Sequence, residues 1–205
     1  YSDDRIWDQV EATLENEGFL VYRIGEVLNQ PGLVPNNGNI IDLAGQVKRA
    51  IDLVKAQTGA SKIHIVAHSM GGLATRFYIR TNYQYDLDKL VTLGTPNEGA
   101  PIARGPIAQF FGNVQGNSSL DLARVQMIPG STFLQLLNSN FGTRGVNHTE
   151  IAGTFLDSIV LLAQPSYAFR ITDSIVPRSS VNIPNIACFQ NRNAHNDFLL
   201  GAAYY

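Results

Sequence analysis

Cysteine is almost absent from this 205-residue chain, which has a single one, Cys188. A lone cysteine cannot form an internal disulfide, and no cysteine–histidine cluster has zinc-binding spacing, so we expect neither a disulfide framework nor a structural metal. Because Cys188 lies in a short apolar run typical of a buried strand, we interpret it as a core residue rather than a nucleophile. The sequence indicates no cofactor.

The chain also lacks long stretches of one charge. Lysine and arginine number 15, aspartate and glutamate number 17, and the formal net charge is -2. This balance provides no basic surface for nucleic acid or anionic membranes, and it favours a neutral or weakly charged small-molecule substrate. No apolar run approaches the roughly 18 residues that a membrane-spanning helix needs. No obligate protein partner is indicated.

What the chain does have is a regular alternation of short apolar runs with longer helical patterns. The runs are rich in β-branched and aromatic residues, as strands are. They cover residues 19–24, 62–67, 89–93, 150–155 and 185–189. Strands that alternate with helices predict an α/β fold, with a mostly parallel sheet flanked by helices on both faces. The length is that of one domain, so we assign residues 1–205 to a single domain.

Two amphipathic helices are predicted near the first strands. In residues 39–60 apolar side chains recur every three or four positions, and Asn39 can cap the start. A second helical pattern, over residues 6–17, ends at Gly18, a residue suited to a left-handed helix stop. Residues 99–146 are instead rich in glycine, proline, asparagine and serine, which predicts a lid-like or cap-like excursion above the sheet.

Residues 63–76 predict a strand, a tight turn at Ser69 and the start of a helix. This is the context of the nucleophile elbow, Gly-x-Ser-x-Gly, whose flanking positions must be small so that strand and helix can approach; here Ala67 stands at the first. Such a strained turn lifts the serine hydroxyl above the carboxyl end of the sheet, and the N–H of Met70 points at a developing oxyanion. We predict Ser69 as nucleophile and Met70 as oxyanion donor, against the alternative of a plain strand-to-helix turn.

A serine nucleophile needs a base, and the chain order for this arrangement is serine, then aspartate or glutamate, then histidine. His195 lies in a polar loop after the last predicted strand and before a terminal helix, which is the expected place for the base. We interpret the other histidines as structural. They are His64, within the strand before the elbow, His68, next to the serine, and His148, before an apolar strand.

The acid of the triad is predicted to be Asp173, which lies in a turn before an extended, proline-ended stretch. It would hold the tautomer of the histidine and stabilise its charged form. Asp157 is a rival, because the Asp-Ser-Ile-Val string recurs there just after an earlier strand. Chain order and loop setting favour Asp173. Asp197 is so close to His195, at a predicted helix start, that helix capping explains it.

Three motifs together resemble bacterial lipases with an alanine-type elbow: residues 67–72 (AHSMGG), 92–96 (TLGTP) and 173–177 (DSIVP). Residues 126–138 are similar to a helical segment above the active site of related lipases and acyltransferases. The resemblance implies an α/β-hydrolase fold, esterase or lipase activity without a metal, a triad of Ser69, Asp173 and His195, and a tendency towards secretion.

The same resemblance implies a further strand, whose following loop carries the second oxyanion donor. In such lipases that strand lies between the strands that correspond here to residues 19–24 and 62–67. A sheet with that gap would leave buried backbone groups unpaired. We therefore expect the native protein to have an N-terminal segment that this sequence does not include.

Several readings of the same residues stay open. Acyl transfer to an alcohol or lipid acceptor uses the same triad, and a non-catalytic hydrolase-like binding module is a third possibility. The apolar side chains of the excursion are candidates for an acyl pocket or a mobile lid that contacts a lipid interface transiently, and the alternative is that they close the core. They are Ile102, Ile107, Phe110, Phe111, Val114, Phe133 and Leu137.

Overall fold

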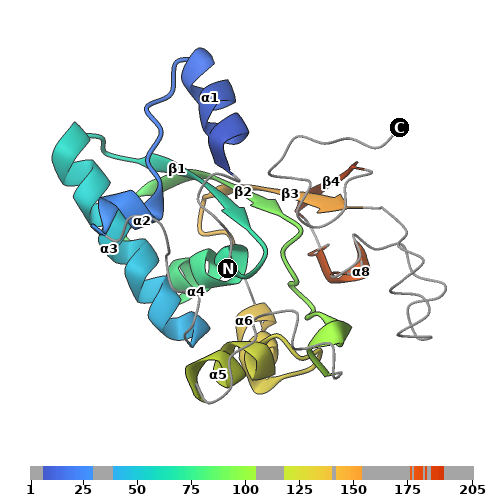
Figure 1. Cartoon of the computed structure of the whole chain (residues 1–205). Helices are drawn as coiled ribbons and strands as arrows, with labels where there is room; N and C mark the ends of the chain where they lie inside the picture. Colours follow the sequence, from blue (N-terminus) through green and yellow to red (C-terminus); the bar gives the residue numbers. More distant parts are fainter. Residues whose placement is uncertain are drawn as a thin grey trace.

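The computed structural model describes residues 7–29, 39–104, 118–139, 142–153, 176, 178–181, 183 and 186–191. Within them, four parallel strands form one sheet in the order β1-β2-β3-β4 (Figure 1). The strands are β1 (Ile63–His68), β2 (Leu87–Leu93), β3 (Asn147–Gly153) and β4 (Ala187–Asn191). The expected parallel sheet is thus confirmed, and the carboxyl ends of its strands share one edge.

Helices α3 (Ile40–Thr58) and α4 (Met70–Thr81) pack together on one face of the sheet (Figure 1). The N-terminus of α3 is capped as expected, because the Asn39 side chain accepts a hydrogen bond from the N–H of Ile41 at 3.0 Å. The helix ends at Gly59, whose φ of 72° is left-handed. The predicted helix over residues 39–60 is therefore confirmed.

The main core lies between this pair of helices, the sheet and two further helices, α5 (Ser118–Gln126) and α6 (Thr132–Asn138). Phe77 of α4 stacks on Phe133 of α6 with their ring centroids 5.7 Å apart. Leu137 of α6 is fully buried in the same core. Of the excursion's apolar residues, Phe133 and Leu137 thus close the core. Residues 105–117 and the side chain of Ile102 lie outside the described part of the chain.

Helix α1 (Asp8–Asn16) lies on the other side of the sheet from α3 and α4 (Figure 1). Just before it, Trp7 packs with Leu93, Val66, Val91 and Ile151 of the first three strands. Gly18 follows the helix with a φ of 88°, as its sequence position predicts. Both faces of the sheet are therefore covered by helices within the described residues.

The strand predicted over residues 19–24 is wrong. Residues 19–23 form no strand, Phe19 is 47% exposed and Leu20 is 80% exposed, and Ile24 begins the short helix α2 (Ile24–Val27). Arg23 instead forms ion pairs with Asp8 and Glu11 of α1, which holds this segment against that helix. In the described part of the chain β1 is consequently one of the two edge strands of the sheet, and the expected gap between two strands has no counterpart there.

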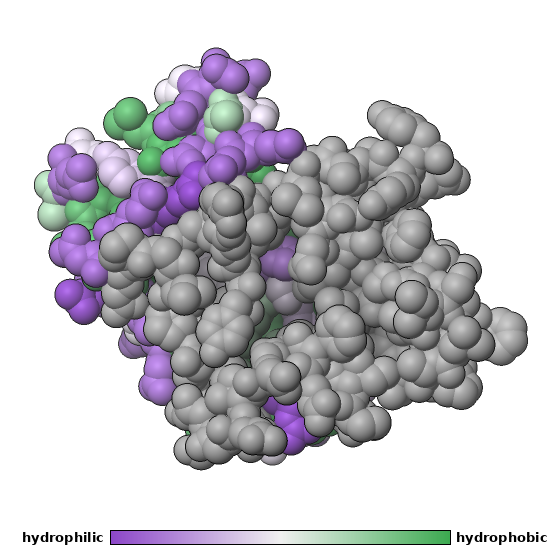
Figure 2. Space-filling model, in the orientation of Figure 1, coloured by the Kyte–Doolittle hydropathy of each residue, from purple (hydrophilic) through white to green (hydrophobic). Residues whose placement is uncertain are grey.

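The described surface over α1 to α3 is mainly hydrophilic, with apolar side chains in small groups (Figure 2). Exposed apolar side chains include Phe19, Leu20, Ile41 and Leu53. Among the helices that the structure describes, none is both long and apolar enough to cross a bilayer.

Candidate active site

Ser69 occupies the single position between the end of β1 at His68 and the start of α4 at Met70. Its backbone has φ 51° and ψ -125°, a conformation that residues other than glycine rarely adopt. Such a conformation costs on the order of 1–3 kcal/mol and persists only where the surroundings hold it in place. The turn therefore has the strained shape that the sequence predicts for a nucleophile elbow.

Two groups at the carboxyl end of β2 hold this turn. The N–H of Ser69 donates to the carbonyl oxygen of Leu93 at 2.9 Å. The carbonyl oxygen of Ser69 accepts a hydrogen bond from Oγ1 of Thr95 at 3.0 Å, and another from the N–H of Gly72 at 3.1 Å. Thr95 is fully buried. Both peptide groups that flank Ser69 are thus fixed by the neighbouring strand and the residues that follow it.

Gly72 is the tight position of the elbow. A Cβ atom added there would lie 2.1 Å from Oγ1 and 2.8 Å from Cγ2 of Thr95. At Gly71, the small position of the motif, an added Cβ would be 3.9 Å from Cβ of Ala67, which is an ordinary van der Waals contact. The absence of a side chain at Gly72, rather than at Gly71, is what lets Thr95 reach the carbonyl group of Ser69.

We expect Gly72→Ala to lower the free energy of unfolding by a few kcal/mol, because a buried methyl group would displace Thr95 and overpack the turn. Gly71→Ala is the matched control. Gly71 is exposed in the first turn of α4, so alanine there should be neutral or should stabilise by about 0.5–1 kcal/mol through helix propensity. Urea unfolding of both variants measures the difference, and equal stabilities would contradict the assignment of Gly72 as the tight position.

Met70 is the first residue of α4, and its side chain is partly buried. The N–H of a first helical residue has no partner within the helix, and the positive end of the helix dipole lies there. This N–H group belongs to the same peptide plane as the carbonyl group of Ser69, which points to Thr95. In a trans peptide the two groups point in opposite directions, so the N–H of Met70 points away from Thr95.

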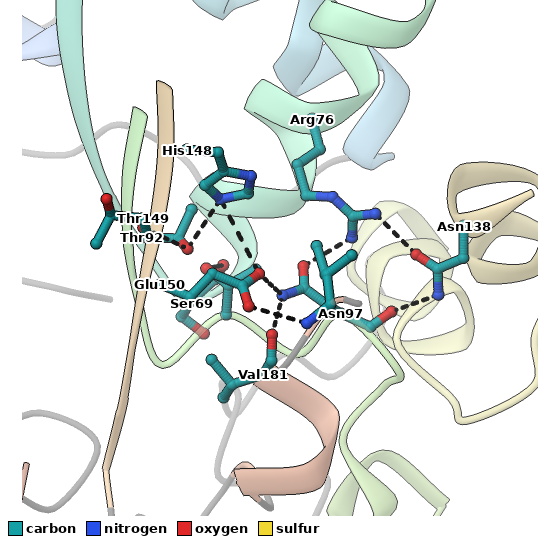
Figure 3. A network of polar contacts seen from close by, with 11 residues as sticks. Ser69, Arg76, Thr92, Asn97, Asn138, His148, Thr149, Glu150 and Val181 are labelled. Carbon is teal, nitrogen blue, oxygen red and sulfur yellow. Dashed lines mark hydrogen bonds and ion pairs between the residues drawn. The ribbon is translucent and has the colours of Figure 1, made fainter. Parts of the chain in front are cut away.

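A buried polar network surrounds the side chains of Arg76 and Asn97 (Figure 3). Arg76 of α4 is fully buried and donates to Oδ1 of Asn97 at 2.7 Å and to Oδ1 of Asn138 at 2.8 Å. The Asn97 side chain also donates to Oε1 of Glu150 at 2.6 Å and to the carbonyl oxygen of Val181 at 2.5 Å. The network joins α4, α6, β3, helix α8 (Arg178–Val181) and the segment after β2.

The ionisable groups in this network have shifted pKa values because they are buried. Burial raises the pKa of Glu150 from 4.5 to about 7, against the opposing effects of the Ile183 N–H, the Arg76 cation and Asn97. Burial and the Arg76 cation lower the pKa of His148 from 6.5 to about 4. Nε2 of this histidine lies 3.3 Å from Oγ1 of Thr92. Burial lowers the pKa of Arg76 to about 10, so this group stays charged at neutral pH.

Glu150 and His148 are expected to act on stability with opposite pH dependence. The pKa of Glu150 is higher in the folded state, so its contribution is complete below about pH 4.5 and is lost as pH rises through 7, by at most about 3 kcal/mol. The pKa of His148 is lower in the folded state, so its contribution is complete above pH 6.5 and is lost as pH falls through 4.

In the wild type the two effects should largely cancel between pH 4.5 and 6.5. Glu150→Gln should therefore make the free energy of unfolding rise with pH over this interval, and His148→Gln should make it fall. Urea unfolding at a series of pH values measures these slopes. Identical slopes in the wild type and both variants would show that neither group is perturbed as described.

The other predicted members of the triad, Asp173 and His195, lie outside the described residues, as does the rival Asp157. The structure does describe the other three histidines. His64 is exposed beside Asp88, with Nδ1 3.7 Å from Oδ2, and its ring meets that of Phe19 edge-on. His148 is buried in the polar network, and His68 ends β1 beside Ser69. Among the described residues, no group of histidine, cysteine and carboxylate side chains could hold a metal ion.

The sequence from residue 34 to residue 186 matches the family model of the PGAP1-like alpha/beta domain. The chain belongs to this family. A triacylglycerol lipase of Pseudarthrobacter phenanthrenivorans is 31% identical over 100 residues, 47% of this chain and 28% of that lipase. Triacylglycerol lipase 2 of Saccharomyces cerevisiae is 27% identical over 99 residues, 47% of this chain and 29% of that protein. The match thus spans between a quarter and a third of these relatives.

Solved structures place this PGAP1-like chain in the α/β-hydrolase fold. The mature form of a Bacillus licheniformis lipase superposes with a TM-score of 0.65 at 17% identity, over 83% of this chain and 72% of that one. Phospholipase PlaB of Legionella pneumophila superposes with a TM-score of 0.68 at 18% identity, over 89% of this chain and 42% of that one. A metagenomic carboxyl esterase gives a TM-score of 0.59 at 14% identity, over 83% and 57% of the two chains. The expected fold is confirmed.

Proposed function

We propose that this PGAP1-like chain is a serine hydrolase that cleaves carboxylic esters. The observation that carries the proposal is the conformation of Ser69, with φ 51° and ψ -125° between a parallel strand and a helix. A strained serine at this place in an α/β-hydrolase fold is the arrangement that exposes a nucleophile at the carboxyl edge of the sheet. The relatives and the superposed proteins that are named lipases, a phospholipase and a carboxyl esterase support ester bonds as the substrate class.

In this proposal Oγ of Ser69 attacks the ester carbonyl carbon while His195 takes the hydroxyl proton. The electron pair of the carbonyl bond moves to its oxygen, and the N–H of Met70 stabilises the resulting oxyanion. Collapse of this intermediate breaks the bond to the alcohol, which leaves with the proton from His195. A water molecule then repeats the sequence on the acyl-enzyme, releases the acid and restores the Ser69 hydroxyl. Asp173 orients the imidazole and stabilises its charged form.

The topology supports His195 as the base. All four strands are parallel, so the chain leaves β4 at the same edge of the sheet at which it leaves β1 to form the Ser69 turn. β4 ends at Asn191, four residues before His195. Three strand spacings separate β1 from β4, or about 14 Å, and four residues of extended chain reach on the order of 13 Å. A histidine side chain adds the remaining reach.

Lipid esters are the proposed substrates. Two relatives are named triacylglycerol lipases, and a neutral glyceride ester suits a chain with a formal net charge of only -2. In this proposal residues 99–146 contribute a lid or a wall of the acyl site, through the part of this segment that does not close the core. Contact with a lipid interface would then be transient, and no metal or organic cofactor enters the chemistry.

The test is hydrolysis of p-nitrophenyl esters with short and long acyl chains, together with labelling by a fluorophosphonate. We expect hydrolysis by the wild type and a single adduct that peptide mass mapping places on Ser69. A preference for long chains would select a lipase, and a preference for short ones an esterase. A folded protein that neither hydrolyses these esters nor forms the adduct would contradict the proposal and favour a binding module.

A further inference from the structure

Thr95 lies 26 residues from Ser69 in sequence. Among the residues that the structure describes, its hydroxyl is nevertheless the side-chain group that donates a hydrogen bond to the carbonyl oxygen of Ser69. We propose that Thr95 is a positioning residue that aims the oxyanion donor. The inference rests on the proposed function, because it assigns a role within the same site. It concerns a residue that does not touch the substrate and acts through one peptide group.

The argument starts from the planarity of the peptide that joins Ser69 to Met70. Its carbonyl oxygen and its N–H hydrogen lie in one plane and on opposite sides, so fixing the direction of one fixes the other. Rotation of this plane is rotation about ψ of Ser69, which has the unusual value of -125°. The Thr95 hydroxyl, 3.0 Å from the carbonyl oxygen, opposes that rotation. The N–H of Met70 is thereby held in a fixed direction before any substrate binds.

Thr95 is itself held firmly. The segment that carries it begins at Gly94, whose N–H donates to the carbonyl oxygen of Ile151 in β3 at 2.9 Å. Two residues after Thr95, the Asn97 side chain joins the buried network with Arg76 and Glu150. The N–H of Glu98 then donates to the carbonyl oxygen of Ser180 at 2.9 Å. Contacts to β3, α4 and α8 thus define where the Thr95 hydroxyl lies.

The close approach at Gly72 gives an independent reason for assigning a role to Thr95. Any side chain at Gly72 would overlap Thr95. The threonine side chain fits against α4 only because residue 72 has no Cβ atom. The carbonyl group of Ser69 already accepts the N–H of Gly72. The Thr95 hydroxyl is a second donor to the same oxygen, and because Thr95 is fully buried, this hydrogen bond is shielded from water.

Preorganised donors contribute to catalysis because they need no reorientation when charge develops. Outright loss of one oxyanion donor costs about 10²–10³-fold in kcat. Loss of the group that aims a donor should cost less, since the donor itself remains. We therefore expect a loss of about ten-fold or more in kcat, with KM nearly unchanged, because the ground-state ester carries little charge on its carbonyl oxygen.

Two matched pairs test the inference. Thr95→Val has nearly the shape of the wild type and lacks the hydroxyl, whereas Thr95→Ser and Thr95→Ala both lack the methyl group and differ only in the hydroxyl. We expect kcat for a p-nitrophenyl ester to fall about ten-fold in Thr95→Val and to differ by a similar factor between Thr95→Ser and Thr95→Ala. The second pair keeps the test decisive where valine impairs folding. Urea unfolding of each variant measures its stability.

A trifluoromethyl ketone supplies the readout that a merely structural role would not move. It forms a tetrahedral adduct with the serine whose oxygen is anionic, so its affinity should fall with kcat while KM stays constant. If folded variants without the hydroxyl keep the kcat and the ketone affinity of the wild type, the inference about Thr95 is wrong, whereas the proposed function stands. A folded wild type without ester hydrolysis would overturn the proposed function, and the inference with it.

Discussion

Ser69→Ala and Ser69→Gly are both expected to lose ester hydrolysis by about 10⁶-fold, and only the glycine variant is expected to gain stability. The loss of activity follows from removal of the nucleophile. The difference in stability follows from the backbone, because φ 51° and ψ -125° are strained for serine and for alanine but are accessible to glycine. Relief of 1–3 kcal/mol of strain, less the greater entropy of glycine in the unfolded chain, leaves about 1 kcal/mol.

Kinetics with a p-nitrophenyl ester and urea unfolding measure the two effects in the same preparations. The alanine variant is the internal control, since it removes the same hydroxyl without relaxing the backbone. If both variants retain ester hydrolysis, the assignment of Ser69 as the nucleophile is wrong. A glycine variant no more stable than the alanine variant would contradict the strain at the turn while leaving the nucleophile in place.

Asp173→Asn should lower kcat by about 10⁴-fold, because asparagine would favour the wrong tautomer of the base and would not stabilise its charged form. The described part of the chain resumes shortly after Asp173, at Val176. Val176, three residues later, is fully buried in a cluster with Ala152 near the carboxyl end of β3 and with Val181 of α8. Val176 itself is thus anchored near the edge of the sheet where the triad would assemble.

Asp157→Asn is the matched control, since it makes the same change within the same four-residue string. We expect its kcat to stay within about two-fold of the wild type. The reverse result, with activity lost in Asp157→Asn and kept in Asp173→Asn, would make Asp157 the acid. Activity kept in both would show that neither aspartate belongs to the triad.

Much of the fold could be predicted from local pattern. The strand that leads to Ser69, the long helix from Ile40 and the later strands all follow from apolar periodicity and from capping residues such as Asn39 and Gly59. The strand predicted over residues 19–24 failed for a reason that the pattern does not contain. An apolar run becomes a strand only where a partner strand receives its backbone groups, and here Arg23 is held by the carboxylates of α1.

In the candidate site, too, features within a continuous stretch of sequence could be predicted and contacts between distant residues could not. The strained turn at Ser69 could be predicted because the elbow is a continuous motif, with its strand and helix in adjacent residues. The contact of Thr95 with this turn could not, because it is a hydrogen bond between residues 26 positions apart and depends on the absence of a side chain at Gly72. The buried network was missed for a similar reason, since Arg76, Asn97 and Glu150 are unremarkable residues until three separate elements bring them together. Pairs of residues distant in sequence carry no local signature.

The chain at Gly99 and Ala100 meets the chain at Met127 and Pro129. The N–H of Ala100 donates to the carbonyl oxygen of Met127 at 2.9 Å, and at Gly99, with φ 94°, an added Cβ would lie 2.7 Å from that same oxygen and from the backbone nitrogen of Pro129. The two ends of the intervening chain are therefore tied together. The free energy of closing such a loop rises only slowly with its length. A change in the number of residues between Arg104 and Ser118 should therefore add little to the free energy of loop closure, while these ties and the residues beneath Ser69 keep their places.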